Sequence, residues 1–388
     1  MNNSAVQAEV LLIGKKLSED ILRPMKGIFV GKDEIIDLLG VCLVARENLF
    51  LHGPPGTAKS ALVQDLAKRI EGNVFDYLLT RFTEPNEVFG PFDIRKLRDG
   101  ELKTNTEGML PEATFVFLDE LLNANSAILN SLLLVLNERV FRRGRETQLL
   151  PTLMVVGASN SLPDDDALGA LFDRFLLRVT CGYVPHEELS NVLDAGWKLE
   201  QTSVKERKTV SLTEVKDLHN LVKHVDFSEV RSHYVELIRR LRHAGISVSD
   251  RRAVKLQRVL AASALLCGRL KANRTDFWVL RYIWDTEEQK DILNTIIADV
   301  IEKSTDEEKE ESHTRSQNNE APNPEHLSQD LDQLETKLKD SDLNERDLAY
   351  LQDQLGILSS RSQWVVEDQQ REFLDNKIRG LWDLLGEK

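Results

Sequence analysis

The sequence has few cysteines and no cysteine motif. Three of its 388 residues are cysteine, namely Cys42, Cys181 and Cys267, and no two have the C-x-x-C spacing that zinc and redox sites need. Each lies among apolar or small residues. This pattern argues against a cysteine-ligated metal centre or a disulfide framework, and it predicts buried free thiols in a reducing cytoplasm.

Long hydrophobic segments are also missing. The first twenty residues, MNNSAVQAEVLLIGKKLSED, contain acidic side chains and an apolar run of only four residues, so they resemble neither a signal peptide nor a membrane span. Hydrophobic residues make up 41% of the chain and charged residues 29%, which suits a globular protein of two or three domains. We therefore expect a soluble, cytoplasmic protein without membrane insertion.

Positive charge is in deficit. The 50 lysines and arginines face 64 acidic residues, which leaves a net charge of −14. A surface of this sign disfavours nucleic acids and anionic membranes, so the composition argues against nucleic acid as a partner. One basic stretch, RRGR from Arg142 to Arg145, is either a local binding patch or the solvated tip of a hairpin.

Between residues 28 and 184, short apolar runs alternate with amphipathic segments, which is typical of a parallel β-sheet with crossover helices. The predicted strands lie in ENLFLHG, NVFDYLLT, ATFVFLDE and TLMVVGASN. In such sheets, ligands bind at the carboxyl ends of the strands. The glycine- and proline-punctuated segment from Thr80 to Pro111 predicts turns and a hairpin inserted into this α/β unit.

The remaining chain predicts helices. We expect an α/β core over residues 1–185, an all-helical domain over 186–303 and a flexible linker over 304–326, where apolar residues are almost absent. Leucines 327, 331, 334 and 338, and then 348, 351, 355 and 358, recur at helical spacing. They predict a C-terminal helical hairpin or short coiled coil over 327–388. It is either a local cap on its own chain or an arm that binds a partner.

The segment GPPGTAKS, which follows a predicted strand and precedes a predicted helix, is close to the phosphate-loop pattern G-x-x-x-x-G-K-[ST]. Lys59 is expected to contact the β- and γ-phosphates of ATP, and Ser60 to hold Mg²⁺. Ala58 replaces the second glycine of the pattern, which costs nothing at negative φ but is strained in the left-handed region. The candidate nucleotide-binding residues here are Gly53, Pro54, Pro55, Gly56, Thr57, Ala58, Lys59, Ser60 and Ala61.

Two adjacent carboxylates end the predicted strand FVFLDE. Because side chains alternate along a strand, Asp119 and Glu120 are expected to point differently. Asp119 then orders the magnesium, while Glu120 acts as the general base on an attacking water.

Two further polar residues, Asn160 and Arg174, are candidates for the same site. Asn160 ends the next predicted strand and is either a turn residue or an amide that contacts the γ-phosphate or orients the water. Arg174 lies between an aspartate and an apolar run. It is either an ordinary ion-paired residue or, in a ring, an arginine finger supplied in trans to a neighbour.

The motifs GPPGTAKS, TRFTEPNEVFGPFDI, GMLPEATFVFLDE, ILNSLLLVLNER, GASNSLP and LFDRF, in this order, resemble the MoxR group of AAA+ ATPases. The segments VSDRRAVKLQRVLAASALLCGR and FWVLRYIWDTEEQ look most like its RavA-type branch. The family also accepts alanine before the Walker lysine. The resemblance, over about residues 10 to 300, implies these roles: Walker A for Lys59 and Ser60, Walker B for Asp119 and Glu120, sensor 1 for Asn160, the finger for Arg174, and sensor 2 for Arg251, with Arg252 as the competing assignment.

The resemblance also implies a function. It predicts an AAA+ core with a parallel sheet and an all-α lid, working as a Mg²⁺-dependent ATPase in a homo-oligomeric ring, a hexamer. Such a ring would remodel or mature a protein client, sometimes with a von Willebrand factor A-domain partner. The inserted hairpin and the hairpin in ERVFRRGRETQLLP would line the ring surface that engages the client. No β-rich module of the RavA type is visible after Lys303. A nucleotide-gated scaffold and a nucleic-acid motor are the alternatives.

Overall fold

Five parallel strands form the central sheet of the computed structural model, in the order β2-β3-β6-β1-β7. The residues of β1, β3 and β6 are nearly all buried, as expected for a sheet with helices on both faces. Four of these strands were predicted; β7 lies in the apolar run after Arg174 and was not. The strand bounds are β1 Leu49–His52, β2 Val74–Leu78, β3 Phe115–Asp119, β6 Met154–Ser159 and β7 Leu177–Thr180.

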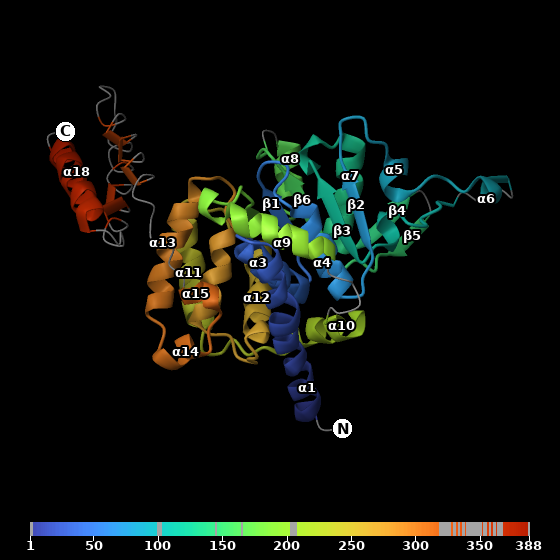
Figure 1. Ribbon diagram of the computed structural model, residues 1–388, viewed down its shortest axis with the longest axis horizontal. Helices are drawn as coiled ribbons and strands as arrows, with labels where there is room; N and C mark the ends of the chain where they lie inside the picture. Colours follow the sequence, from blue (N-terminus) through green and yellow to red (C-terminus); the bar gives the residue numbers. More distant parts are fainter. Residues whose placement is uncertain are drawn as a thin grey trace.

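The structure describes residues 3–98, 103–143, 146–163, 166–201, 208–317 and 368–386, with isolated positions between 327 and 362. Arg145 and residues 318–326 of the predicted linker lie outside them. Helices cover the sheet and extend to the N-terminus (Figure 1). Their bounds are α1 Asn3–Lys16, η1 Leu17–Leu22, α2 Arg23–Ile28, α3 Asp33–Ala45, α4 Lys59–Arg69, η2 Leu110–Glu112, η3 Leu121–Asn123, α7 Ser126–Glu138 and α8 Asp166–Phe172.

Two hairpins project from the sheet, as the sequence predicted. The first is irregular: it carries α5 (Pro85–Phe89) and α6 (Ile94–Arg98), and Phe92 and Thr104 form an antiparallel bridge. The second pairs β4 (Val140–Arg143) with β5 (Glu146–Leu149). The arm with α6 reaches farthest from the sheet, at the right of Figure 1.

The second domain is helical, as predicted, apart from an isolated bridge between Asp226 and Lys271. The N-terminal helix α1 packs on α10 and α12, so the beginning of the chain contacts this domain as well. The bounds are η4 His186–Glu188, α9 Leu189–Gln201, α10 Leu212–Leu221, η6 Val222–His224, α11 Arg231–His243, α12 Asp250–Leu266, η7 Arg274–Tyr282 and α13 Gln289–Glu302.

The predicted flexible linker is wrong for residues 304–317. They form α14 (Asp306–Glu310) and α15 (Thr314–Gln317), and they pack on the helical domain. His313 stacks on Trp278 with ring centroids 4.6 Å apart, and Arg315 pairs with the buried Asp37 at 3.0 Å. The charged composition predicted a solvent-exposed linker, whereas these side chains have charged or aromatic partners elsewhere in the fold.

The C-terminal part has a hydrophobic core of its own. The predicted leucine face is buried there at the described positions, and Leu348 lies outside them. A further helix, α18 (Asp368–Gly386), contributes Leu374, Ile378 and Leu381 to this core. The described positions of this region are therefore helical as predicted, with α18 packing on the leucine face.

Candidate active site

The loop after β1 is held in a shape that requires glycine. The amide of Gly53 donates to the carbonyl of Ser159 at 3.0 Å, and a Cβ on Gly53 would lie 2.2 Å from the carbonyl oxygen of Cys181. Gly56 has a φ of +76°. The chain then enters α4, whose N-terminal amides and dipole favour an anion. The local geometry therefore suits a phosphate group at the carboxyl edge of the sheet.

Ala58 adopts the strained alternative. Its φ of 63° and ψ of 24° lie in the left-handed region, immediately before α4. This conformation costs an L-residue about 1–2 kcal/mol, which glycine avoids. The loop therefore keeps the backbone shape of the glycine-containing motif despite the alanine.

Lys59 closes the loop. Its side chain is largely buried, and Nζ donates to the carbonyls of Gly53 at 2.7 Å and Pro54 at 3.1 Å. Thr57 Oγ1 donates to the same Pro54 carbonyl at 3.0 Å. Ser60 is half-buried in the first turn of α4. A positive charge and a hydroxyl thus stand beside the helix N-terminus, which fits a nucleotide phosphate and its magnesium.

The two carboxylates lie at the end of β3. Asp119 is the last residue of the strand, and its Oδ1 accepts from the Glu120 amide at 3.0 Å. Glu120 has a φ of 51°, which turns it off the strand, and its Oε2 accepts from Asn123 Nδ2 at 3.2 Å. The expected divergence of the two side chains therefore rests on a left-handed backbone at Glu120 as well as on strand alternation.

Asn160 completes this edge. It is exposed and directly follows β6, the strand between β3 and β1. Since Ser159 accepts from Gly53, Asn160 lies next to the phosphate loop. The structure thus brings Lys59, Ser60, Asp119, Glu120 and Asn160 to the carboxyl ends of three neighbouring strands.

Arg174 lies at the amino ends of the strands, the edge of the sheet opposite the phosphate loop. It precedes β7, whose first residue Leu177 pairs with Leu49, the first residue of β1. Its carbonyl accepts from Asn48 Nδ2 at 3.2 Å, and its guanidinium pairs with Asp173 at 3.0 Å. A strand of four residues spans about 13 Å, so Arg174 is separated from its own phosphate loop by the length of β1.

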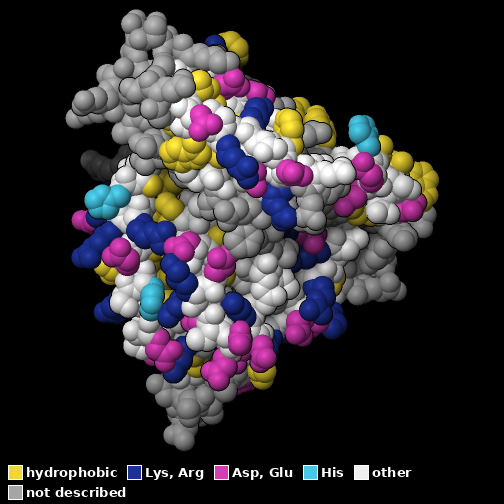
Figure 2. All heavy atoms as spheres, turned by 90° about the vertical axis from the view of Figure 1, so that its left-hand side faces the viewer, with side chains coloured by type: hydrophobic (Ala, Val, Ile, Leu, Met, Phe, Trp, Pro, Cys, Tyr) yellow, Lys and Arg dark blue, Asp and Glu magenta, His cyan; other side chains and the backbone are white. Residues whose placement is uncertain are grey.

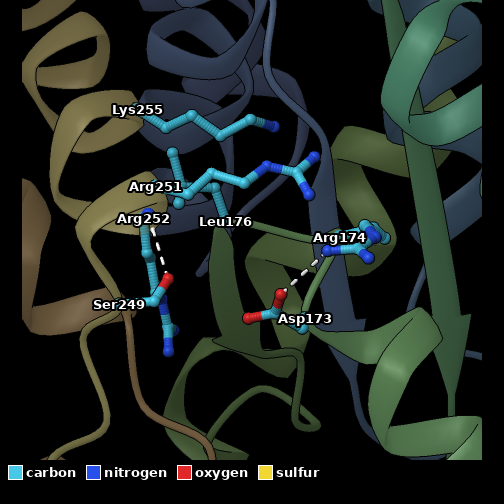
Figure 3. A pocket seen from close by; sticks show the side chains of 7 residues that line it. All are labelled: Asp173, Arg174, Leu176, Ser249, Arg251, Arg252 and Lys255. Carbon is cyan, nitrogen blue, oxygen red and sulfur yellow. Dashed lines mark hydrogen bonds and ion pairs between the residues drawn. The ribbon is translucent and has the colours of Figure 1, made fainter.

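Arg251 and Arg174 line the same small cavity, of about 20 Å³ (Figure 3). Arg251 is exposed, lies in the first turn of α12 and donates to Asn137 Oδ1 at 2.6 Å. Both arginines therefore lie at the amino edge of the sheet, away from the phosphate loop of their own chain. The sensor 2 role of Arg251 stays a prediction.

Arg252, the competing sensor, is buried in a structural network. Its guanidinium donates to the carbonyls of Ser247 and Ile283 and pairs with Asp285 at 3.1 Å. In Figure 3 its side chain points away from Arg251. The structure therefore leaves Arg251 as the arginine at this position that is open to an incoming group.

Arg178 is a core residue that the sequence analysis missed. It is fully buried on β7 and donates to the carbonyl of Trp284 at 2.7 Å, while pairing with Asp285 at 2.8 Å. Burial lowers its pKa to about 9, and the neighbouring charge of Arg252 acts in the same direction. An arginine inside the apolar run FLLRVT was the signal. Arg178 fastens the helical domain to the edge of the sheet.

A second group of missed residues surrounds the phosphate loop. Cys181 Sγ donates to Thr57 Oγ1 at 3.3 Å, and the hydroxyl of Tyr183 donates to the Pro55 carbonyl at 3.3 Å. His52 lies 3.3 Å from Glu287 of the helical domain. These contacts connect the loop to the segment after β7 and to the lid.

The described residues contain no group of three or more His, Cys, Asp or Glu side chains placed to hold a metal ion. No helix among them is both long enough and apolar enough to cross a membrane.

Two family models match the chain. The one described as the MoxR domain in the MoxR-vWA-beta-propeller ternary systems matches residues 15–220, more than half of the sequence. The AAA lid domain matches residues 227–297.

Individual proteins agree with these matches. Two uncharacterised proteins of Methanocaldococcus jannaschii are 36% and 35% identical, over 69% and 74% of this chain and 71% and 74% of their own lengths. Chaperone MoxR1 of Mycobacterium tuberculosis is 28% identical over 44% of this chain and 45% of its own. A crystal structure from Cytophaga hutchinsonii, whose description proposes an ATPase, is 21% identical with a TM-score of 0.63, covering 79% of this chain and 99% of that one. This last likeness shows the fold.

Proposed function

The chain belongs to the MoxR family of AAA+ ATPases, and from this premise we propose that it is a Mg²⁺-dependent ATP hydrolase whose site is shared between two copies. One observation carries the proposal: Arg174 and Arg251 lie together at the edge of the sheet opposite the phosphate loop. Within one chain, these arginines cannot complete the site at the phosphate loop. A second copy stacked head to tail would bring its Arg174 and Arg251 to the phosphate loop of the first copy.

Within one chain, the residues at the carboxyl edge of the sheet would bind the nucleotide and activate the attacking water. Lys59 would hold the β- and γ-phosphates, and Ser60 and Asp119 would hold the magnesium. Bound Mg²⁺·ATP supplies the phosphoanhydride bond to be cleaved. Glu120, held by Asn123, would accept the proton of the attacking water, while Asn160 orients that water. From the neighbouring copy, Arg174 and Arg251 would neutralise charge on the transferred group.

A head-to-tail contact repeated through a closed rotation makes a ring, and we propose a hexamer, in the cytoplasm. The relation to the RavA-type branch rests on the segments of α12 and η7 and belongs to this proposal. The matching family model is described by MoxR-vWA systems, which supports a von Willebrand factor A-domain partner. The name of the MoxR1 relative supports chaperone-like remodelling of a protein client.

The two hairpins would engage the client. At the start of the first, a tight turn presents Phe82, 91% exposed, and the turn is held by a 2.9 Å hydrogen bond from the Thr80 amide to Thr83 Oγ1. A fully exposed phenylalanine on a fixed turn costs solvation energy that contact with a client would recover. A scaffold that merely binds ATP is the second candidate, because the C-terminal helices have a core separate from that of the ATPase domains.

The test is ATP hydrolysis per chain as a function of protein concentration, with mass measured in parallel, for the wild type, Glu120→Gln and Arg174→Ala. We expect specific activity to rise with assembly. Both variants should bind ATP and assemble, yet hydrolyse it at least about tenfold more slowly. A rate that is independent of concentration, with Arg174→Ala fully active, would replace the shared site with the scaffold.

A further inference from the structure

Helix α9 carries an unpartnered apolar face. Leu189, Leu193 and Trp197 are 48%, 67% and 69% exposed, and their spacing of four residues places them on one side of the helix. Beside them, an open cavity of about 490 Å³ is lined by Asp33, Glu188 and Asp194, and also by Lys26, whose charge is paired with the buried Asp37 at 2.6 Å. In Figure 2, hydrophobic and acidic side chains lie together at the right-hand edge. An apolar stripe bordered by acids marks an interaction surface.

This surface belongs to the side of the chain that holds the phosphate loop. The segment leading into α9 contacts that loop through the hydroxyl of Tyr183 on the Pro55 carbonyl. This segment also contacts the turn between α2 and α3, since a Cβ on Gly31 would lie 2.5 Å from Val184. The beginning of α9 therefore lies on the phosphate-loop side of the chain.

The opposite edge carries a complementary surface on α12. Arg251, Val254 and Arg258 recur at spacings of three and four, and the side chains of Val254 and Arg258 are 65% and 41% exposed. Arg46 is exposed at the end of α3, the helix on which α12 packs.

Acids also lie at this edge. Glu47 is buried and paired with Lys255 and Arg258. Asp173 and Asp250 are exposed, but each is paired with an arginine, Arg174 and Arg242 respectively. This face is therefore basic around one exposed valine.

The two surfaces are connected through α3. Helix α12 packs on α3, and α9 packs on α2, which in turn contacts α3. Copies related head to tail by a modest rotation keep their orientation, so the α12 edge of one copy faces the α9 edge of the next. Acidic residues then oppose basic ones, and the apolar stripe opposes Val254.

We infer that the apolar face of α9 and its acidic cavity form the docking surface for the α12 edge of a second copy of this chain. This inference rests on the proposed shared site, because the same approach brings Arg174 and Arg251 to the neighbouring phosphate loop. It adds which surfaces meet and why they meet in one orientation.

The test uses two full-length variants with complementary defects. Trp197→Glu damages the α9 face and leaves the α12 face intact; Val254→Glu does the reverse. Both residues are largely exposed, so the fold should survive, and Leu12→Glu, equally exposed on α1, is the matched control. With ATP, each variant alone should stay monomeric and lose at least about tenfold in hydrolysis rate, while the control assembles like the wild type.

An equimolar mixture of the two variants should form heterodimers with one intact interface. The mixture should recover activity up to about half of the wild-type rate per chain, because only one site per pair is complete. Adding Arg174→Ala to the Trp197→Glu chain should abolish this recovery, since that chain supplies the finger. Adding it to the Val254→Glu chain should change nothing.

Other outcomes overturn the inference in distinguishable ways. If Trp197→Glu assembles normally while Arg174→Ala still fails in the assembled state, the shared site stands and α9 binds something else, such as the C-terminal helices or another protein. If both variants assemble poorly but the mixture does not recover, the two surfaces do not meet each other. If hydrolysis never depends on assembly, the proposed function fails as well.

Discussion

Asn48 holds the backbone of Arg174 in place: its Nδ2 donates to the Arg174 carbonyl at 3.2 Å. Asn48 is buried immediately before β1, the strand that leads into the phosphate loop. Its Oδ1 accepts from the guanidinium of Arg139 at 2.6 Å and from the amide of Val155 on β6 at 3.4 Å. A single amide side chain therefore joins the backbone of Arg174 to the strands that end in the phosphate loop and in Asn160.

Replacing Asn48 with leucine should loosen this junction. The near-isosteric side chain fills the space but leaves buried polar groups of Arg139 and Arg174 unpaired, which should lower the free energy of unfolding by about 3 kcal/mol. Chemical denaturation measures this change. Asn220→Leu, at an exposed position on α10, is the control and should cost less than about 0.5 kcal/mol. Equal stability of the two variants would show that the Asn48 contacts contribute nothing net.

Replacing Arg251 with alanine should mainly reduce ATP hydrolysis, whereas replacing Arg252 with alanine should mainly reduce stability. Arg251 is exposed, so its loss should leave the melting temperature nearly unchanged while hydrolysis falls at least tenfold in the assembled protein. Arg252 is buried with Asp285 and the carbonyl of Ile283, so its loss should cost about 2 kcal/mol or more of stability. Thermal unfolding and ATPase assays on both variants decide the assignment. A destabilised Arg251→Ala with normal turnover would reverse it.

Local motifs predicted one edge of the site and could not predict the other. Lys59, Asp119 and Asn160 each follow an apolar strand, and parallel strands bring their carboxyl ends together without further information. The position of Arg251 depends instead on how α12 packs on α3, which no local pattern encodes. Strand β7 was missed for a similar reason, because Arg178 looks unsuited to a buried strand until the carbonyls of the lid satisfy it.

His219 should make the protein less stable in mild acid. Burial lowers its pKa from 6.5 to about 4, and the charges of Arg46 and Arg258 act in the same direction. Between these values the unfolded chain binds a proton that the folded chain does not, so stability is complete above pH 6.5 and declines as the pH falls toward 4. The full loss is about 3 kcal/mol.

The check is the free energy of unfolding measured from pH 7 to pH 4.5 for the wild type and His219→Gln. Glutamine does not titrate and retains a donor for the Leu43 carbonyl, which His219 Nε2 approaches to 2.8 Å. The variant should therefore show a flatter dependence on pH across this window. An identical slope in both proteins would assign the acid sensitivity to other groups.

Arg143 should control how firmly the inserted hairpin is held. Its guanidinium donates to the Gly90 carbonyl and to Asn86 Oδ1, both at 2.7 Å, and lies 3.9 Å above the ring of Phe92. Limited trypsin digestion at the basic residues of α6 should therefore become several-fold faster in Arg143→Ala, because local opening costs less free energy. Arg142→Ala is the matched control, since this neighbour is exposed and pairs with Glu138 on its own side of the hairpin. Unchanged ATP hydrolysis at saturating protein would confine the effect to the hairpin, and equal cleavage of the two variants would show that Arg143 does not restrain it.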